Sequence, residues 1–345
     1  MTTAATPAAE QSEAGRPRRF QIPERFFRLQ SYVALVLVFL AAIAVSPRRG
    51  GDLVFLNSEN LLNIVRATSE IGIIAVGMTF VILIGGIDLS VGAILGLSAT
   101  GAASLLMVSD VGVVPTVIVI LGLGLAFGAA QGLISARLGI QSFIVTLAGL
   151  QIARGLARIW SGGQGVPLAY GDGPGLAPET FALLNSRTFN GTVPIPALIF
   201  LAVAVIALVV VRNSVFARHV YAVGGNERAA RLSGVRVTRI KVAVFALSGF
   251  LAALAGIIHA GQLNQGSPND GSGYELDAIA AVVIGGTSLM GGVGTVAGTL
   301  AGALLLGILN NILALNNIDA NVQLLIKGAI IIVAAGIQAF RSQRR

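Results

Sequence analysis

The feature that most constrains this chain is a series of continuous apolar segments, most of them about 20 residues long. A helix of about 20 apolar residues is long enough to cross the hydrocarbon core of a bilayer, since each residue advances it by about 1.5 Å. The segments lack the strict alternation of apolar and polar residues that a transmembrane β-strand shows. The chain is therefore predicted to be an all-α, polytopic membrane protein.

The composition agrees with a location in lipid. Of the 345 residues, 55% are hydrophobic and 11% are charged, whereas charged residues make up about a quarter of an ordinary soluble domain. The 44 glycines fit this environment, because glycine lets membrane helices approach closely. The net charge of +8 does not indicate nucleic-acid binding, since the basic residues gather at the ends of apolar segments. The lack of cysteine excludes disulfides and thiol chemistry.

About ten membrane-spanning helices are predicted, with both termini on the cytoplasmic side. The expected segments are 29–45, 61–84, 89–108, 114–136, 143–160, 195–211, 242–262, 278–290, 293–315 and 322–340. We expect residues 1–28 to be a disordered basic tail and residues 29–340 to form one transmembrane domain. Residues 341–345 form a second short basic tail. A cleaved signal peptide is the alternative for the first apolar run.

The segment 212–241 has the strongest charge bias in the chain. Seven basic residues lie in it against a single acid, Glu227. Loops rich in lysine and arginine stay on the cytoplasmic side of a membrane, so this segment is predicted to lie there. Arg48 and Arg49 are the exception, because the same topology places them outside.

An internal repeat joins residues 84–92 and 284–292, which match at five positions with an offset of 200 residues. Each copy carries a glycine pair and precedes a helix rich in small residues. This pattern predicts two repeated halves with glycine-interrupted helices, as many transporters have. Chance similarity between glycine-rich helices is the alternative.

The glycine pairs allow two interpretations. One is a tight turn between two helices, with Asp88 or Ser90 accepting hydrogen bonds from the next helix. The other is a helix broken near the membrane midplane, where opened backbone groups and nearby hydroxyls and amides bind a neutral polyol. The second interpretation gives these candidate residues for a substrate path: Gly85, Gly86, Asp88, Ser90, Gly285, Gly286, Thr287, Ser288 and Asn310.

Glycines also recur at every fourth residue in two further helices. Gly124, Gly128 and Gly132 form one such row, and a second begins at Gly294. Rows of this kind make flat faces for contact between helices, so we interpret them as packing surfaces rather than ligand contacts.

Signatures of catalysis are missing from the sequence. No Gly-Lys dipeptide is present, so the chain has no phosphate-binding loop for ATP. His219 and His259 are far apart in the sequence, and no metal site is expected. The chain is thus predicted not to be an enzyme, and its energy must come from another polypeptide or from an ion gradient.

The segment 224–235, GGNERAARLSGV, resembles the G-x-N-x-x-A-A-x-L-S-G-I segment of the ribose/xylose/galactoside-type permeases of ABC importers. Three further stretches are similar to that family in the family's order: FVILIGGIDLSVGA at 80–93, SFIVTLAGLQIARGLA at 142–157 and VVIGGTSLMGGVGTVAGTLAGAL at 282–304. Together they extend the resemblance over residues 60–340. Two departures are modest: Ser142 stands where the family usually has proline, and Val235 where isoleucine is common.

The resemblance implies a monosaccharide permease subunit of the bacterial inner membrane that forms a homodimer. Such a chain binds no cofactor, because a separate cytoplasmic ATPase subunit uses the ATP. A periplasmic or lipid-anchored sugar-binding protein docks outside, and Arg48, Arg49 and Arg187 are expected to contact it. The expected contacts with the ATPase are Gly225, Asn226, Glu227, Arg228, Ala229, Ala230, Arg231 and Gly234.

Two alternatives remain at this point. Permeases for branched-chain amino acids or nucleosides share the architecture and some of the glycine motifs. An ion-coupled secondary transporter would work without an ATPase, but it needs acids within the membrane, and this chain offers chiefly Glu70 and Asp88.

Overall fold

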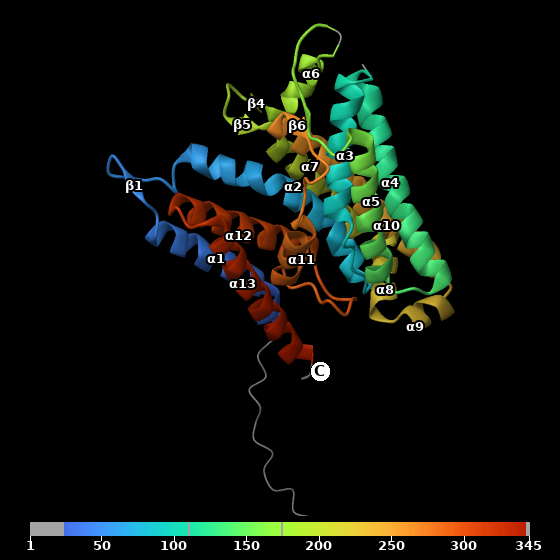
Figure 1. Cartoon of the computed structure of the whole chain (residues 1–345). Helices are drawn as coiled ribbons and strands as arrows, with labels where there is room; N and C mark the ends of the chain where they lie inside the picture. Colours follow the sequence, from blue (N-terminus) through green and yellow to red (C-terminus); the bar gives the residue numbers. More distant parts are fainter. Residues whose placement is uncertain (1–23, 110, 174, 343–345) are drawn as a thin grey trace, which may run out of the picture.

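The computed structural model describes residues 24–109, 111–173 and 175–342, and long helices dominate them (Figure 1). The all-α class is confirmed. The long helices are α1 (Glu24–Ala44), α2 (Ser58–Leu83), α3 (Val91–Met107), α4 (Val113–Leu138), α5 (Ser142–Ser161), α7 (Ile195–Asn213), α10 (Val237–Leu263), α12 (Val296–Leu315) and α13 (Ala320–Ser342). Strands within the described residues are short pairs in loops: β1 (Arg48–Arg49) with β2 (Asp52–Leu53), β3 (Val166–Pro167) with β6 (Gln265–Gly266), and β4 (Arg187–Thr188) with β5 (Val193–Pro194).

Within the described residues, 6 helices are long and apolar enough to cross a membrane, namely α2, α4, α5, α7, α10 and α12. Shorter apolar stretches occupy Gln30–Ala44, Val91–Met107 and Ala320–Val333. Helix α11 (Tyr274–Ile284) has 11 residues and is too short to cross alone, since a span needs about 20. A polytopic helical membrane protein is thus supported, and the number of about ten spans stays a prediction.

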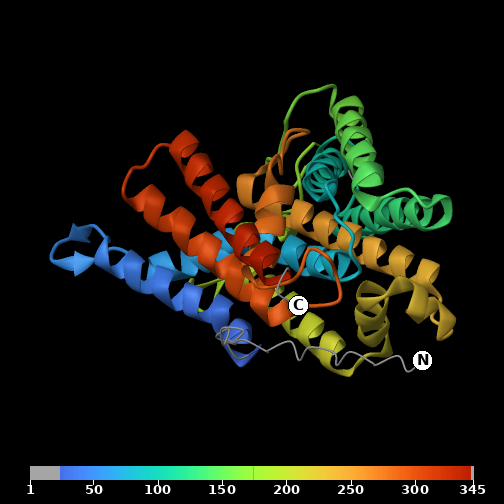
Figure 2. The same ribbon diagram turned by 90° about the horizontal axis from the view of Figure 1, so that it is seen from below.

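Helix α10 lies at the centre of the molecule, packed against α4, α3 and α2. Helix α12 packs against α2, α11 and α1. Helix α2 therefore contacts two groups of helices, one around α10 with α3 and α4 and the other around α12 with α1 and α11. The view from below shows α1, α12 and α13 on the opposite side of the molecule from α4 and α5 (Figure 2). This arrangement makes α2 the helix that joins the two groups.

The predicted packing role of the glycine rows is confirmed. A Cβ on Gly128 would overlap the carbonyl oxygen of Phe245 in α10, and one on Gly124 would overlap that of Gly249. In the second row, a Cβ on Gly298 would overlap the carbonyl oxygen of Gly285. These backbones touch because no side chain separates them.

The molecule has two distinct ends (Figure 1). At the top of the figure lie α6 (Glu179–Ala182), the short 3₁₀ helix Leu183–Asn185 and the β4–β5 pair. At the bottom lie α8 (Val215–Gly225) and α9 (Glu227–Leu232). We call these the α6 end and the α9 end.

The loop 264–273 between α10 and α11 folds back along the protein. Strand β6 pairs with β3, and the Arg154 Nη1 of α5 donates to the carbonyl oxygens of Pro268 and Asp270, each at 2.6 Å. The backbone of Gly271 then lies directly against Gly92 of α3. The loop therefore fills the space between α3 and α5, and it ends where α11 begins.

Several predicted boundaries differ from the structure. The helix expected at 278–290 ends at Ile284, because Gly286 takes a left-handed φ of +86°, and regular helix resumes only at α12. Helix α1 begins at Glu24, inside the expected tail 1–28, of which residues 1–23 lie outside the described residues. Helix α13 likewise continues to Ser342, inside the expected tail 341–345, and residues 343–345 are not among those described.

Candidate functional site

The basic segment 212–241 contains the short helix α9, which Asn226 caps. The Asn226 Oδ1 accepts a hydrogen bond from the Ala229 N–H at 2.9 Å, which satisfies a free donor of the first turn. The Glu227 carboxylate accepts from Lys241 Nζ at 2.8 Å and from Arg231 at 3.1 Å, so it ties α9 to the start of α10. The hydrogen bond from Lys241, with the positive charges nearby, lowers the pKa of Glu227.

The exposed face of α9 is basic. Arg228, Ala229 and Arg231 are exposed, whereas Ala230 is buried against the rest of the protein. Ala229 is therefore the small residue that this face offers to a partner, and Ala230 is not. Gly225 and Gly234 flank the helix, and both are exposed.

Three distant chain segments meet beside α9 at what we call the glycine joint, made of Leu83, Gly85, Gly224, Gly291 and Gly292. The Gly292 N–H donates to the Leu83 carbonyl at 2.9 Å, and a Cβ on Gly224 would overlap that same carbonyl. A Cβ on Gly291 would come within 2.8 Å of the Gly85 nitrogen. The ends of α2 and α8 are thus in direct backbone contact with the segment 285–295.

A side-chain hydrogen bond adds a further contact between α8 and the glycine joint. The Tyr221 hydroxyl of α8 donates to the Gly294 carbonyl at 2.8 Å. Both glycine-pair breaks therefore rest on the helix that leads directly into α9. The end of α2 and the segment 285–295 are therefore both packed directly against α8.

Asp88 and Ser90 belong to a buried hydrogen-bond network. The Asp88 carboxylate accepts from the Ser90 N–H at 3.0 Å, from the Ser90 hydroxyl at 2.6 Å and from the Ser248 hydroxyl at 2.8 Å. The Ser90 hydroxyl in turn accepts from Gln131 at 3.0 Å. This network joins the first break to α4 and α10. Asp88 accepts from the N–H of Ser90, which precedes α3, and the Ser90 side chain makes no capping hydrogen bond to that helix, so the predicted cap of the next helix is not observed.

The second break is arranged differently. Thr287 is fully buried, and a Cβ on Gly294 would overlap it. The Ser288 hydroxyl accepts from the Met290 N–H at 3.2 Å, within a turn of the break. The two copies of the repeat therefore differ in their local contacts, although each follows the end of a helix.

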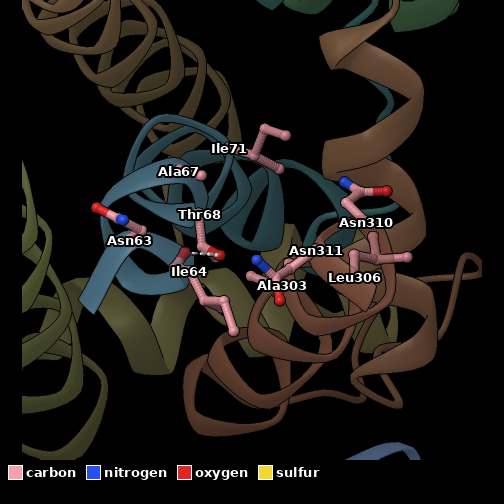
Figure 3. Close-up of a pocket in the computed structure, with 10 residues that line it drawn as sticks. Asn63, Ile64, Ala67, Thr68, Ile71, Ala303, Leu306, Asn310 and Asn311 are labelled. Carbon is pink, nitrogen blue, oxygen red and sulfur yellow. Dashed lines mark hydrogen bonds between the residues drawn. The ribbon is translucent and has the colours of Figure 1, made fainter. Parts of the chain in front are cut away.

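A cavity of about 300 Å³ lies between α2 and α12. Figure 3 shows its side chains, which come from these two helices. The lining residues are Asn63, Ile64, Ala67, Thr68, Ile71, Ala303, Leu306, Gly307, Asn310 and Asn311. None of them is charged, so the cavity combines amide and hydroxyl groups with aliphatic walls.

Asn310 is the predicted site residue that the structure places in this cavity. Its Oδ1 is buried and has no hydrogen-bond partner among the described residues. The glycine pairs lie at the opposite end of α2, and sequence reasoning did not identify Asn63 or Thr68, because isolated polar residues in an apolar helix carry no motif.

The three expected docking arginines lie apart from α9. Arg48 and Arg49 are exposed on β1. Arg187 lies on β4 and is partly buried, with Nη2 donating to Asn63 Oδ1 at 2.7 Å and lying 3.9 Å from Glu59. Arg187 therefore contacts a residue of the cavity wall.

Apolar helices with an uncharged cavity between them, an exposed basic helix and glycine-lined breaks are features of a multi-pass membrane permease. The particular family follows from sequence comparison. The chain belongs to the family described as branched-chain amino acid transport system / permease component, whose model matches residues 60–335.

Individual relatives are more specific. The chain is 42% identical to the ribose import permease protein RbsC of Haemophilus influenzae, over 91% of this chain and 94% of the relative. It is 41% identical to the RbsC protein of Bacillus subtilis, over 89% and 91%. Identity to the xylose transport system permease protein XylH of Escherichia coli is 35%, over 92% and 94%. The predicted relationship to ribose/xylose-type permeases is confirmed. No solved structure gives a significant match.

Proposed function

We propose that this protein is the permease subunit through which an ABC importer moves a neutral monosaccharide across the bacterial inner membrane. The observation that carries the proposal is the 42% identity to a ribose import permease, which extends over 91% of the chain. The chemistry of the cavity supports it, since amides and hydroxyls beside aliphatic walls suit a molecule with hydroxyl groups and an apolar ring face.

An amino acid is the main alternative, because the family description names amino acid transport. A zwitterion carries a carboxylate and an ammonium group, and both lose hydration on entering a buried site unless charged or strongly polar groups replace it. The lining of the cavity provides no charged side chain. A sugar meets no such penalty, so the lining favours the monosaccharide.

The energy is proposed to come from a separate ATPase subunit that contacts α9. Exposed Arg228 and Arg231 offer charge to such a partner, and Gly225, Asn226 and Gly234 shape the ends of the helix. In this proposal α9 is cytoplasmic, as both termini are. The permease binds no cofactor of its own.

A sugar-binding protein is proposed to dock at the opposite, α6 end. Arg187 lies there, and exposed Arg48 and Arg49 offer further positive charge. Two copies of the chain form the translocation unit in this proposal.

The substrate path is proposed to begin at Asn310 and to follow α2 toward the glycine joint. The remaining candidates, Gly85, Gly86, Asp88, Ser90, Gly285, Gly286, Thr287 and Ser288, then line or control its inner part. The position of both breaks against α8 supports this order, because opening there would follow movement of α9.

Uptake in reconstituted vesicles tests the function. The permease, its ATPase and its binding protein are expected to accumulate labelled ribose or xylose only when ATP is supplied on the α9 side. Uptake of leucine in place of both sugars would favour the amino acid permease. Uptake that persists without the ATPase subunit would refute the importer.

A further inference from the structure

The polar groups of the cavity between α2 and α12 are not equivalent. Asn60 and Asn311 exchange two hydrogen bonds, at 3.1 and 2.8 Å, and so satisfy each other across the two helices. The Thr68 hydroxyl donates to the Ile64 carbonyl at 2.7 Å, one turn earlier (Figure 3). These contacts hold the walls together and leave little hydrogen-bonding capacity for a ligand.

Asn310 differs from these residues. Its Oδ1 is buried beside the cavity without a donor among the described residues. A buried amide oxygen without a partner is costly, so native proteins rarely retain one unless water or a ligand supplies the donor. A sugar hydroxyl is a donor of the right kind, since it is neutral and can accept a second hydrogen bond in return.

The aliphatic part of the cavity wall suits the apolar face of a sugar ring. Ile64, Ile71 and Leu306 present aliphatic surface to the cavity. Gly307 lets α12 approach α2, because a Cβ there would overlap Thr68 Oγ1. At about 300 Å³ the cavity lies at the lower end of the range of ligand pockets, which is enough for a single sugar ring.

Asn63 connects this cavity to the α6 end. Its Oδ1 accepts from Arg187, which lies on β4 and also faces Glu59. Arg187 itself is not part of the cavity wall. It acts as a positioning residue, because its hydrogen bond fixes the orientation of the Asn63 amide. An acidic group of a partner docked at β4 would compete with Asn63 for the same guanidinium.

We propose that the cavity is a binding site for one neutral sugar ring in each copy of the chain. The Asn310 side chain turns its Oδ1, which protein atoms cover in this structure, toward the cavity to accept a hydroxyl hydrogen bond, and Asn63, oriented by Arg187, contributes the second amide. The proposal rests on the proposed function and adds a place and a set of contacts to it.

The test measures binding to the purified permease without its binding protein, by saturation-transfer NMR with millimolar D-ribose and D-xylose, and with L-leucine as the zwitterionic comparison. Wild-type protein is expected to give a signal with a sugar and none with leucine. Asn310→Leu keeps the branching of the side chain but replaces the amide with two larger methyl groups, so it is expected to abolish the signal and to lower uptake at least tenfold. Asn321→Leu changes an exposed asparagine and is expected to retain both.

Thermal unfolding separates binding from folding. Asn310→Leu removes a buried oxygen that lacks a partner, so its midpoint is expected to stay unchanged or rise. Should this variant not fold, Ala67→Leu fills the cavity without touching an amide and is expected to abolish the signal as well. Arg187→Gln should weaken the signal severalfold even with no binding protein present, and Arg187→Lys should restore part of it.

Binding and uptake together separate a failure of the proposed sugar site from a failure of the proposed permease function. If the wild-type complex transports a sugar while Asn310→Leu and Ala67→Leu bind and transport it normally, this site is refuted and the permease function stands. If the wild-type complex transports no monosaccharide, the proposed function fails first. A leucine signal that Asn310→Leu abolishes would overturn the assignment of a sugar to the cavity.

Discussion

Gly224 at the end of α8 lies so close to the Leu83 carbonyl at the end of α2 that even a Cβ on Gly224 would overlap that oxygen. The same carbonyl accepts the hydrogen bond from Gly292. The helix that leads into α9 is thus in backbone contact with both breaks. This contact offers a physical route by which force on α9 can reach the proposed substrate path.

Gly224→Ala is expected to abolish transport. The new methyl group must push α8 away from Leu83 and Gly292, and overpacking of this kind costs about 1–3 kcal/mol. Uptake in vesicles should fall more than about tenfold, because a cost above 1.4 kcal/mol at the joint exceeds a factor of ten in a conformational equilibrium. The ATPase rate of the complex, measured in parallel, shows whether hydrolysis continues without transport.

Gly122→Ala in α4 is the matched control for this prediction. No atom lies within 4 Å of the place where its Cβ would be, and the residue is helical. It should retain wild-type uptake. Equal loss of uptake in both variants would show that an added methyl group on any helical glycine impairs transport, and the contact with Leu83 would then carry no special role.

The exposed charges of α9 are expected to act in assembly. Arg228 is exposed and has no ion pair among the described residues, so Arg228→Glu should weaken binding of the ATPase subunit without changing the unfolding temperature of the permease. Glu227→Lys should also loosen α9 itself, because it removes the contacts to Lys241 and Arg231. Co-purification with the ATPase checks both variants, and normal assembly of Arg228→Glu would contradict the proposed contact.

The order of α9 should depend on pH through Glu227. Its folded pKa lies below the ordinary value of 4.5, chiefly because Lys241 donates a hydrogen bond to it. The contact therefore stabilises α9 at pH values above 4.5 and is lost as the pH falls through the lowered pKa. The chain has no cysteine, so a spin label on Ala229→Cys reports this helix alone. The label should become mobile only in that acidic range, whereas with Glu227→Gln it should be mobile at neutral pH.

Asp88→Asn is expected to destabilise the protein. Three hydrogen bonds end on this fully buried carboxylate, and an amide replaces one acceptor oxygen with a donor. The unpaired groups should lower the free energy of unfolding by about 1–3 kcal/mol. Thermal unfolding in detergent measures the effect, and Asp172→Asn at an exposed loop position is the control. An unchanged midpoint with lost transport would instead favour a direct role in the substrate path.

The sequence was sufficient to predict the helical membrane class, because apolar segments of spanning length leave few other folds. It also singled out the segment 224–235 that contains α9, because the residues of that segment are neighbours along the chain. The glycine pairs marked the interruptions locally, but the expected span 278–290 ran through the second one, where α11 ends at Ile284. Each of these predictions concerns neighbours along the chain.

Contacts between distant segments could not be predicted in this way. The glycine joint brings Leu83 to Gly224 and Gly292, and no periodicity links those positions. The cavity depends on how α2 crosses α12, which is set by side-chain packing along both helices rather than by a motif. The hydrogen bonds from Arg154 to the loop 264–273 likewise join residues more than 100 positions apart in the chain.

Arg154 supplies the last prediction, which concerns this loop. Its Nη1 donates to two backbone carbonyls, of Pro268 and Asp270, and its Nη2 donates to Ser272, whereas Arg158 makes one longer hydrogen bond of 3.2 Å to Asn269. Hydrogen bonds from a charged donor contribute about 1.5–3 kcal/mol each, so Arg154→Gln should speed amide exchange in residues 264–273 by about tenfold or more.

Arg158→Gln serves as the comparison, because it lies one turn away on the same helix and should change exchange only slightly. Exchange measured by mass spectrometry resolves the loop from α10 and α11. If both variants exchange like the wild type, the loop is held by its contacts with α3 near Gly92 and not by the arginine. If Arg154→Gln also accelerates exchange at the start of α11, the loop and this helix open as one unit, since α11 begins where the loop ends.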